Sequence, residues 1–123
     1  MSLARVILPW SKTSDFSQNA RVHWAARHRR VKAQKDTTTI LAKQAGWQKV
    51  KLPESGRIVL RVTLCPPPRG PFPDDDNALS ANKGALDALA AVLGVDDRRF
   101  RPVVERGERS RHGAVIVTME AVE

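Results

Sequence analysis

Acidic side chains gather in two short runs, which are the clearest candidates for chemistry in this sequence. One run is Asp74-Asp75-Asp76 and the other is Asp96-Asp97. Adjacent carboxylates repel one another, so a run of them is costly unless cations or hydrogen bonds compensate. Oxygen-rich carboxylate sites suit Mg²⁺ or Mn²⁺, and such ions can activate water for phosphodiester hydrolysis. The runs predict a divalent-metal site, with two alternatives left open: Asp76 can cap a following helix, and the second run can lie in a solvated turn.

The segment between the two runs is typical of a helix that brings further side chains to the acids. At about 100° per residue, Asp76, Lys83 and Asp87 fall in a narrow sector of such a helix. We therefore expect them to line one edge of a shared groove. Beside a metal site, Lys83 can hold a scissile phosphate or stabilise a leaving oxygen. A plain salt bridge between Lys83 and a carboxylate is the alternative.

Competing motifs do not account for the first acidic run. An EF-hand loop needs an oxygen ligand where Ala78 stands and a glycine after it. The sequence has neither a phosphate-binding P-loop nor a dinucleotide-binding glycine fingerprint. His23 and His28 are five residues apart, a poor spacing for one helix face, and His112 is isolated. We expect none of the three histidines to bind a metal ion.

The chain is strongly basic for its size. It has 123 residues, of which 41% are hydrophobic, and this is enough for one core in a single domain over residues 1–123. The formal net charge is +8 and the sequence pI is about 10.6. A small domain with this balance typically meets a polyanion, most often nucleic acid. A surface that is merely soluble is the alternative.

The basic residues fall into groups that we predict to contact DNA phosphates. A solvated helix face is the alternative for the first group. Trp24 and Trp47 can stack on unpaired bases, although we favour them as anchors in the core or in a dimer interface. The candidate cations are Arg21, Arg27, Arg29, Arg30, Lys32 and Lys35 on the expected first helix, Arg69 before the first acidic run, and Arg98, Arg99 and Arg101 after the second.

The sequence also indicates a compartment. Cys65 is the only cysteine, so neither an intramolecular disulfide nor a thiolate zinc cluster can form within one chain. We expect Cys65 to be a buried small hydrophobe. No apolar stretch approaches the roughly 18 residues that span a bilayer, and no signal-peptide pattern is visible. We expect a cytoplasmic protein without membrane contact.

Hydrophobic periodicity predicts an α/β (α+β) fold with the element order β-α-β-α-β-β and helices packed on one mixed sheet. The Pro-rich stretch Pro66–Pro73 is expected to be an ordered connection. Gly94 is expected to end the second helix, whose apolar stripe would be Leu79, Leu86, Leu89 and Leu93. The expected strands are Leu3–Trp10, Arg57–Leu64, Phe100–Glu105 and Ala114–Ala121, and the expected helices are Ala20–Trp47 and Asn77–Leu93.

The strings Asp74-Asp75-Asp76-Asn77, Lys83-Gly84-Ala85-Leu86-Asp87-Ala88-Leu89 and Leu93-Gly94-Val95-Asp96-Asp97 together resemble the signature of RusA-like Holliday-junction resolvases. Leu8-Pro9-Trp10 and Val103–Gly107 also resemble that family, and the similarity is dense from Pro66 to Glu108. In one respect the chain departs from the family pattern. Lys83 lies seven residues past Asp76, a longer spacing that is similar to phage-derived members, and this weakens the role assigned to Lys83 by resemblance.

The resemblance implies a RusA-like fold and a homodimeric endonuclease that resolves four-way DNA junctions by paired symmetric nicks in recombination and repair. It implies Mg²⁺ as the cofactor, with Mn²⁺ as a substitute, and no small-molecule cofactor. Asp74, Asp76 and Asp97 would bind the metal, and these three acids with Lys83 would form the catalytic set. The DNA contacts would come from Arg21, Arg27, Arg29, Arg30, Lys32, Arg69, Arg98 and Arg99.

Two other functions remain open from the residues. One is a non-catalytic basic DNA-binding protein whose acidic run only caps a helix. The other is a metal-dependent nuclease or phosphohydrolase that acts on flaps, other branched DNA or nucleotides.

Overall fold

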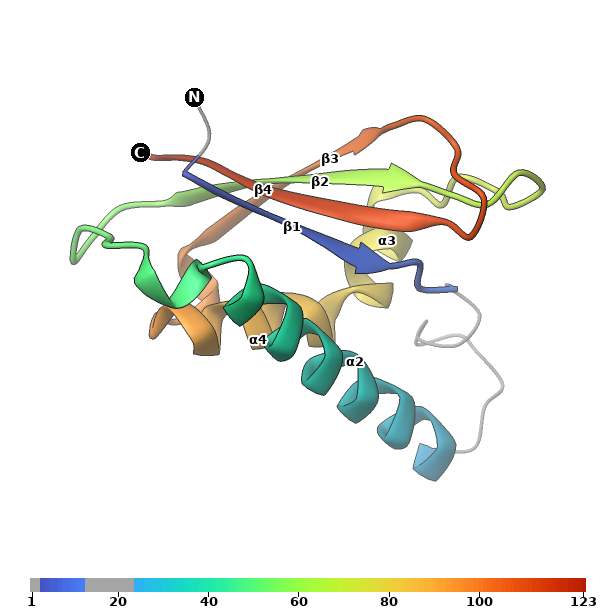
Figure 1. Ribbon diagram of the computed structural model, residues 1–123, viewed down its shortest axis with the longest axis horizontal. Helices are drawn as coiled ribbons and strands as arrows, with labels where there is room; N and C mark the ends of the chain where they lie inside the picture. Colours follow the sequence, from blue (N-terminus) through green and yellow to red (C-terminus); the bar gives the residue numbers. More distant parts are fainter. Residues whose placement is uncertain (1–2, 13–23) are drawn as a thin grey trace.

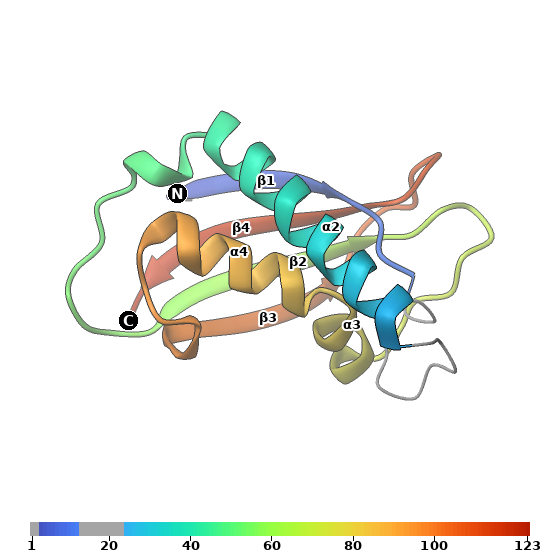
Figure 2. The ribbon, with the colours of Figure 1, turned by 90° about the horizontal axis from the view of Figure 1, so that it is seen from below.

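The computed structural model describes residues 3–12 and 24–123, and these form one α+β unit around a single sheet (Figure 1). All the helices lie on one face of this sheet (Figure 2). The elements in chain order are β1 (Ala4–Pro9), α2 (Trp24–Gln44), η1 (Trp47–Lys49), β2 (Ile58–Cys65), α3 (Asp75–Ala81), α4 (Lys83–Leu93), η2 (Asp97–Arg99), β3 (Phe100–Arg106) and β4 (Ala114–Val122).

The sheet is mixed and has the strand order β1-β4-β2-β3. β4 pairs antiparallel with both β1 and β2, whereas β2 and β3 pair in parallel. Parallel neighbours need a long crossover connection, and here α3 and α4 provide it. The predicted fold class, with helices packed on one mixed sheet, is confirmed.

The core lies between the sheet and the helices. On β2 the side chains of Ile58, Leu60, Val62 and Leu64 are buried and alternate with more exposed ones, as a half-buried strand requires. Trp47 is fully buried, which confirms its prediction as a core anchor. Trp24 is 75% exposed, so the core interpretation of this residue is wrong.

The first helix is shorter than the predicted Ala20–Trp47. It ends at Gln44, because Gly46 takes a left-handed backbone conformation (φ 86°) and Trp47 then begins η1. Residues 20–23 lie outside the described part. Thr39 fits into α2 by donating its hydroxyl to the Lys35 carbonyl (2.8 Å). Among the described residues, none of the helices combines the length and apolar character needed to cross a bilayer.

The segment Asn77–Leu93, predicted to be a single helix, forms two helices, and the apolar stripe predicted for it is also wrong. The helical segment breaks at Asn82, whose Nδ2 donates to the Ala78 carbonyl (2.8 Å). The buried face is rich in alanine rather than leucine: Leu89 is buried, whereas Leu79, Leu86 and Leu93 are half-buried. Gly94 ends α4 in a left-handed conformation (φ 73°), as predicted.

Small residues let α4 approach α2 closely. Gly84, at the start of α4, faces α2 so tightly that an added Cβ would lie 2.5 Å from Gln34 Oε1 and 3.3 Å from both the side chain and the carbonyl oxygen of Val31. This contact brings the basic helix α2 against the helix that follows the acidic run.

Gly113, in the turn before β4, sits against Trp10 at the end of β1. It has φ 76°, and an added Cβ would lie 2.6 Å from the Trp10 Cβ. Gly46 has a similar φ of 86° with open space around it.

We predict that Gly46→Ala lowers the free energy of unfolding by about 1–2 kcal/mol, the penalty of a left-handed alanine. Gly113→Ala should lower it by more, because Trp10 must also move. Urea unfolding of both variants measures the difference, and equal losses of stability would contradict the assigned packing.

Candidate functional site

The first acidic run caps α3. Asp74 is the residue before the helix, and its Oδ1 accepts from the Asn77 backbone N–H (2.8 Å) while Oδ2 accepts from Asn77 Nδ2 (3.3 Å). Asp75 and Asp76 lie exposed in the first turn. The capping residue is therefore Asp74 and not Asp76, because the helix begins two residues earlier than predicted. Carboxylates here also interact favourably with the helix dipole.

The proline-rich loop before α3 is fastened to the connection between β3 and β4. Arg109 donates to the carbonyl oxygens of Pro67 and Gly70. The guanidinium carbons of Arg106 and Arg109 lie 4.8 Å and 4.9 Å from the centre of the Phe72 ring, within cation–π range. These contacts fix the loop that delivers Asp74. Sequence reasoning missed Phe72, Arg106 and Arg109, since their contact spans residues far apart in the chain.

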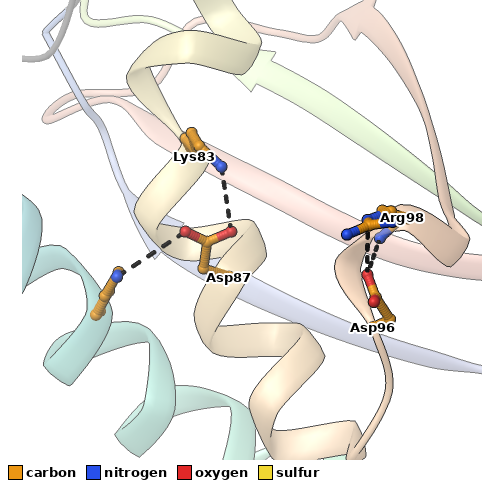
Figure 3. Close-up of polar contacts among 5 residues, drawn as sticks. Lys83, Asp87, Asp96 and Arg98 are labelled. Atoms are coloured by element: carbon orange, nitrogen blue, oxygen red, sulfur yellow. Dashed lines mark hydrogen bonds and ion pairs between the residues drawn. The ribbon is translucent and has the colours of Figure 1, made fainter.

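Lys83 and Asp87 form an ion pair one turn apart on α4 (Figure 3), with 3.6 Å between Nζ and Oδ1. The other carboxylate oxygen of Asp87 lies 3.9 Å from Lys35 Nζ on α2. Asp87 is thus shared between a lysine of the basic helix and the lysine of the predicted site. Lys83 is 70% exposed, so its pair with Asp87 is weak and screened by solvent.

A groove runs along α4 and brings Lys83 and Asp87 together with Asp97. Its other lining residues are Leu79, Ser80, Leu86, Phe100 and Pro102. The predicted groove contained Asp76 instead of Asp97. That prediction is wrong, because α3 lines the groove with Leu79 and Ser80, whereas Asp76 lies exposed in the first turn of α3. Asp97 and Asp87 also face a second hollow at the far end of α4.

The second acidic run begins η2. Asp96 Oδ1 accepts from the Arg98 backbone N–H (2.9 Å), and Arg98 Nε lies 3.8 Å from the same oxygen (Figure 3). The hydrogen bond from the Arg98 backbone holds the pKa of Asp96 below its ordinary value, and the charge of Arg98 lowers it further. Asp97, the next residue, is exposed.

The three acids assigned to the metal by resemblance are not gathered in one chain. Asp74 and Asp76 lie at the start of α3, and Asp97 lies at the start of η2, at the other end of α4 (Figures 1 and 2). Within residues 3–12 and 24–123, no group of three or more His, Cys, Asp or Glu side chains could hold a metal ion. The donor chemistry suits Mg²⁺, since these are exposed carboxylates, but a single chain does not bring the donors together.

Several predicted DNA-binding cations lie on the surface. Arg29, Arg30 and Lys32 are exposed on α2, where Lys32 pairs with Asp36 (2.9 Å), and Arg27 is half-buried. Arg69 is exposed in the proline-rich loop, and the Arg98 side chain is 91% exposed. Arg21 lies outside the described residues.

Arg99 and Arg101 have structural partners. Arg99 donates to the carbonyl oxygens of Gly56 (3.0 Å) and Pro53 (2.9 Å), so it fastens the loop before β2. Arg101 pairs with Glu123 (2.9 Å). These contacts leave Arg99 less suited to a phosphate than its neighbour Arg98.

The predicted burial of Cys65 is confirmed. Cys65 is buried, and burial raises the pKa of its thiol above the ordinary value, which makes it a structural residue. His28 and His112 are exposed, and His23 lies outside the described residues.

Comparison with known proteins adds one relative. No family model matches the chain. A protein of Xylella fastidiosa (strain Temecula1 / ATCC 700964), named only "Uncharacterized protein", is 42% identical over 118 residues, which cover 94% of this chain and 74% of the relative.

The hydrogen bond from the Arg98 backbone N–H to Asp96 predicts how the stability of the protein depends on pH. A carboxyl whose pKa is lowered by folding stabilises the protein at neutral pH, and this contribution is lost as pH falls through the folded-state pKa. We expect Asp96→Ala to be less stable than the unsubstituted protein at pH 7, and the gap to narrow on acidification. Asp96→Asn keeps an acceptor for the Arg98 N–H and is the control. Urea midpoints across pH measure the gap, and one that widens in acid would contradict the assigned cause.

Proposed function

The chain belongs to the same family as the Xylella fastidiosa protein, whose name assigns no activity, and we propose from the chain's own residues that it is a Mg²⁺-dependent endonuclease of four-way DNA junctions. The observation that carries this proposal is the groove along α4, whose lining includes both Lys83 and Asp97, on a helix that packs against the cationic helix α2. The resemblance to RusA-like resolvases supports the same activity. A DNA substrate also implies that the protein acts in the cytoplasm.

Each polar residue has a role that its surroundings support. Asp74, Asp76 and Asp97 are exposed carboxylates of the kind that Mg²⁺ or Mn²⁺ prefers. A metal ion held by them would make a bound water a better nucleophile towards phosphorus. Lys83 would stabilise the charge that develops on the scissile phosphate. Its weak pair with Asp87 keeps its ammonium group over the groove and is easily exchanged for a phosphate.

The separation of the acids supports a homodimer. Asp74 and Asp76 lie at one end of α4 and Asp97 at the other, and the described residues of one chain form no three-donor group that could hold a metal ion. Two copies related by a two-fold axis can bring the start of α3 of one copy to η2 of the other, twice. A four-way junction has two symmetric strands to cut, so two such sites match the substrate.

The surface charge supports a DNA backbone contact. Arg29, Arg30 and Lys32 of α2 are exposed, as are Arg69 and Arg98, and the chain carries a formal net charge of +8. Arg27 of α2, and Arg21, which precedes α2 in the sequence, complete the set of cations proposed to contact DNA phosphates. Phosphate contacts of this kind fix the position of DNA without reading its sequence.

A second candidate is a DNA-binding protein without catalytic activity. It is favoured by one observation, the use of Asp74 as the cap of α3, because capping alone explains why an acid stands there. A nuclease for flaps or other branched DNA would use the same residues, and comparing cleavage of linear, flap and four-way substrates separates it from the main proposal.

The first prediction from this proposal concerns nicking of a labelled four-way junction in Mg²⁺. We expect Asp76→Asn and Asp97→Asn each to lose at least about 100-fold in rate, since loss of even an outer-sphere partner of a metal costs 10–100-fold. Asp75→Asn is the matched control, because Asp75 lies exposed in the same helical turn without an assigned role. Equal activity of Asp76→Asn and Asp75→Asn would contradict the metal assignment and leave a binding protein.

Mixing the two inactive variants tests whether a site is shared between copies. If it is, a mixed dimer of Asp76→Asn with Asp97→Asn regains one intact site. Random co-assembly makes half of the dimers mixed, each with one of its two sites intact, so nicking should recover to about a quarter of the wild-type rate. No recovery in dimers shown to be mixed would place all three acids of a site in one chain.

The α2 cations should govern the salt dependence of junction binding. We expect Arg29→Ala to reduce the slope of log affinity against log salt concentration by about one, the share of one phosphate contact. Arg61→Ala is the control, because Arg61 lies on β2, alternates with buried Leu60 and Val62, and pairs with Glu120 (2.9 Å). A slope that falls equally in both variants would contradict a binding surface on α2.

A further inference from the structure

A cavity of about 200 Å³ lies where the end of β1, helix α2 and the junction of α3 with α4 meet. Its walls include Leu8, Trp10, Ala33, Gln34, Asn82 and Ala85. It is larger than the engineered apolar cavity of about 150 Å³ that holds a benzene ring. The cavity can therefore accept one planar ring system, and most of its surface is apolar.

The polar groups of the wall point to a ring that carries hydrogen-bonding groups. Asn82 is only 4% exposed, and its Nδ2 donates to the Ala78 carbonyl (2.8 Å). Because a carbonyl can only accept, this bond fixes the orientation of the amide and leaves Oδ1 to accept from another donor. A buried amide with one open acceptor, in the wall of a cavity, favours a ligand with an N–H group.

Gln34 forms part of the same wall, with its Oε1 packed against Gly84 of α4. Its Nε2 donates to Ser11 Oγ (2.9 Å) and to the Ala81 carbonyl (2.8 Å), so its amide orientation is also fixed. Its Oε1 is buried and has no hydrogen-bond partner in the part of the chain that is described. Buried acceptors without partners cost free energy unless a donor completes them. A purely aliphatic occupant of the cavity would leave Asn82 Oδ1 open.

The surroundings specify which ring fits. Trp10 gives an aromatic wall on which a base can stack, and Arg30 lies in the lining beside the other cations of α2. A ring that stacks and donates N–H groups at its edge fits a nucleobase, and the nearby cations of α2 suit the phosphates of the nucleotide that carries it.

We propose that this cavity holds one unpaired nucleobase of the DNA substrate. The inference rests on the proposed nuclease function and names the feature that the enzyme recognises, a base that has left the stack at a branch point. Stacking on an aromatic side chain tolerates any base, so the cavity selects DNA structure rather than sequence.

The test compares two fluorescein-labelled duplexes in EDTA, where cleavage does not occur. One duplex carries a single unpaired adenine, and the other has an abasic residue at that position. We expect fluorescence anisotropy to give about tenfold tighter binding of the adenine duplex, the size of one base-stacking contact. Ala33→Phe and Thr37→Phe place a ring in the lining from exposed positions of α2 and should lower this ratio of affinities to about one.

Ala45→Phe is the matched control, because Ala45 is exposed just past the other end of α2, away from the cavity. It should keep the tenfold ratio, and thermal unfolding midpoints should show that all three variants are folded. A ratio near one in the wild-type protein would overturn the proposal, as would a ratio that Ala33→Phe and Thr37→Phe leave unchanged.

Junction nicking in Mg²⁺, measured alongside, separates this inference from the proposed function. Nicking by a wild-type protein whose affinity ratio is one overturns only the base-binding cavity. A tenfold ratio without nicking supports the cavity and overturns only the nuclease. Failure to bind either duplex overturns the base-binding cavity, and the nicking assay then decides the nuclease by itself.

Discussion

The parallel pairing of β2 with β3 is the constraint on which the rest of the structure depends. Two parallel neighbours cannot be joined by a tight turn, so the chain must cross from the end of β2 back to the start of β3. The crossover consists of the proline-rich loop, α3, α4 and η2, and it carries both acidic runs. Its direction places the first run beyond the end of β2 and the second just before β3. The distance between the two runs is thus set by the length of a strand and of α4.

Packing of α2 on α4 joins the basic surface to this crossover. Gly84 permits a close approach to Val31, and Lys35 of α2 lies near Asp87 of α4. The Gln34 side chain hydrogen-bonds both to Ser11, which follows β1, and to the carbonyl oxygen of Ala81 at the end of α3. One helix therefore presents cations to solvent, closes the wall of a cavity and positions the lysine-bearing helix. A substitution on the face of α2 that packs against α4 is expected to affect several of these features together.

Some of the fold could be predicted because it follows from local patterns. Alternation of Ile58, Leu60, Val62 and Leu64 predicted a half-buried strand, and Gly94 predicted the end of α4 through its left-handed conformation. The helix break at Asn82 could not be predicted in this way. Asparagine is tolerated in many helices, and the break becomes favourable only through the bond of its side chain to Ala78 and the packing of Gly84 on α2.

The sequence by itself determined the composition of the candidate site: two acidic runs, a lysine between them, a net positive charge and no second cysteine. These are properties of residue type and short spacing, which local chemistry fixes. The tertiary structure decided which of these groups meet. Asp97 lines the same groove as Lys83 although fourteen positions separate them in the chain, and Asp76 does not. Phe72 contacts Arg106 at the end of β3 and Arg109 in the turn after it. Such contacts depend on the path of the crossover and on strand register, which arise only when the whole chain packs into one core.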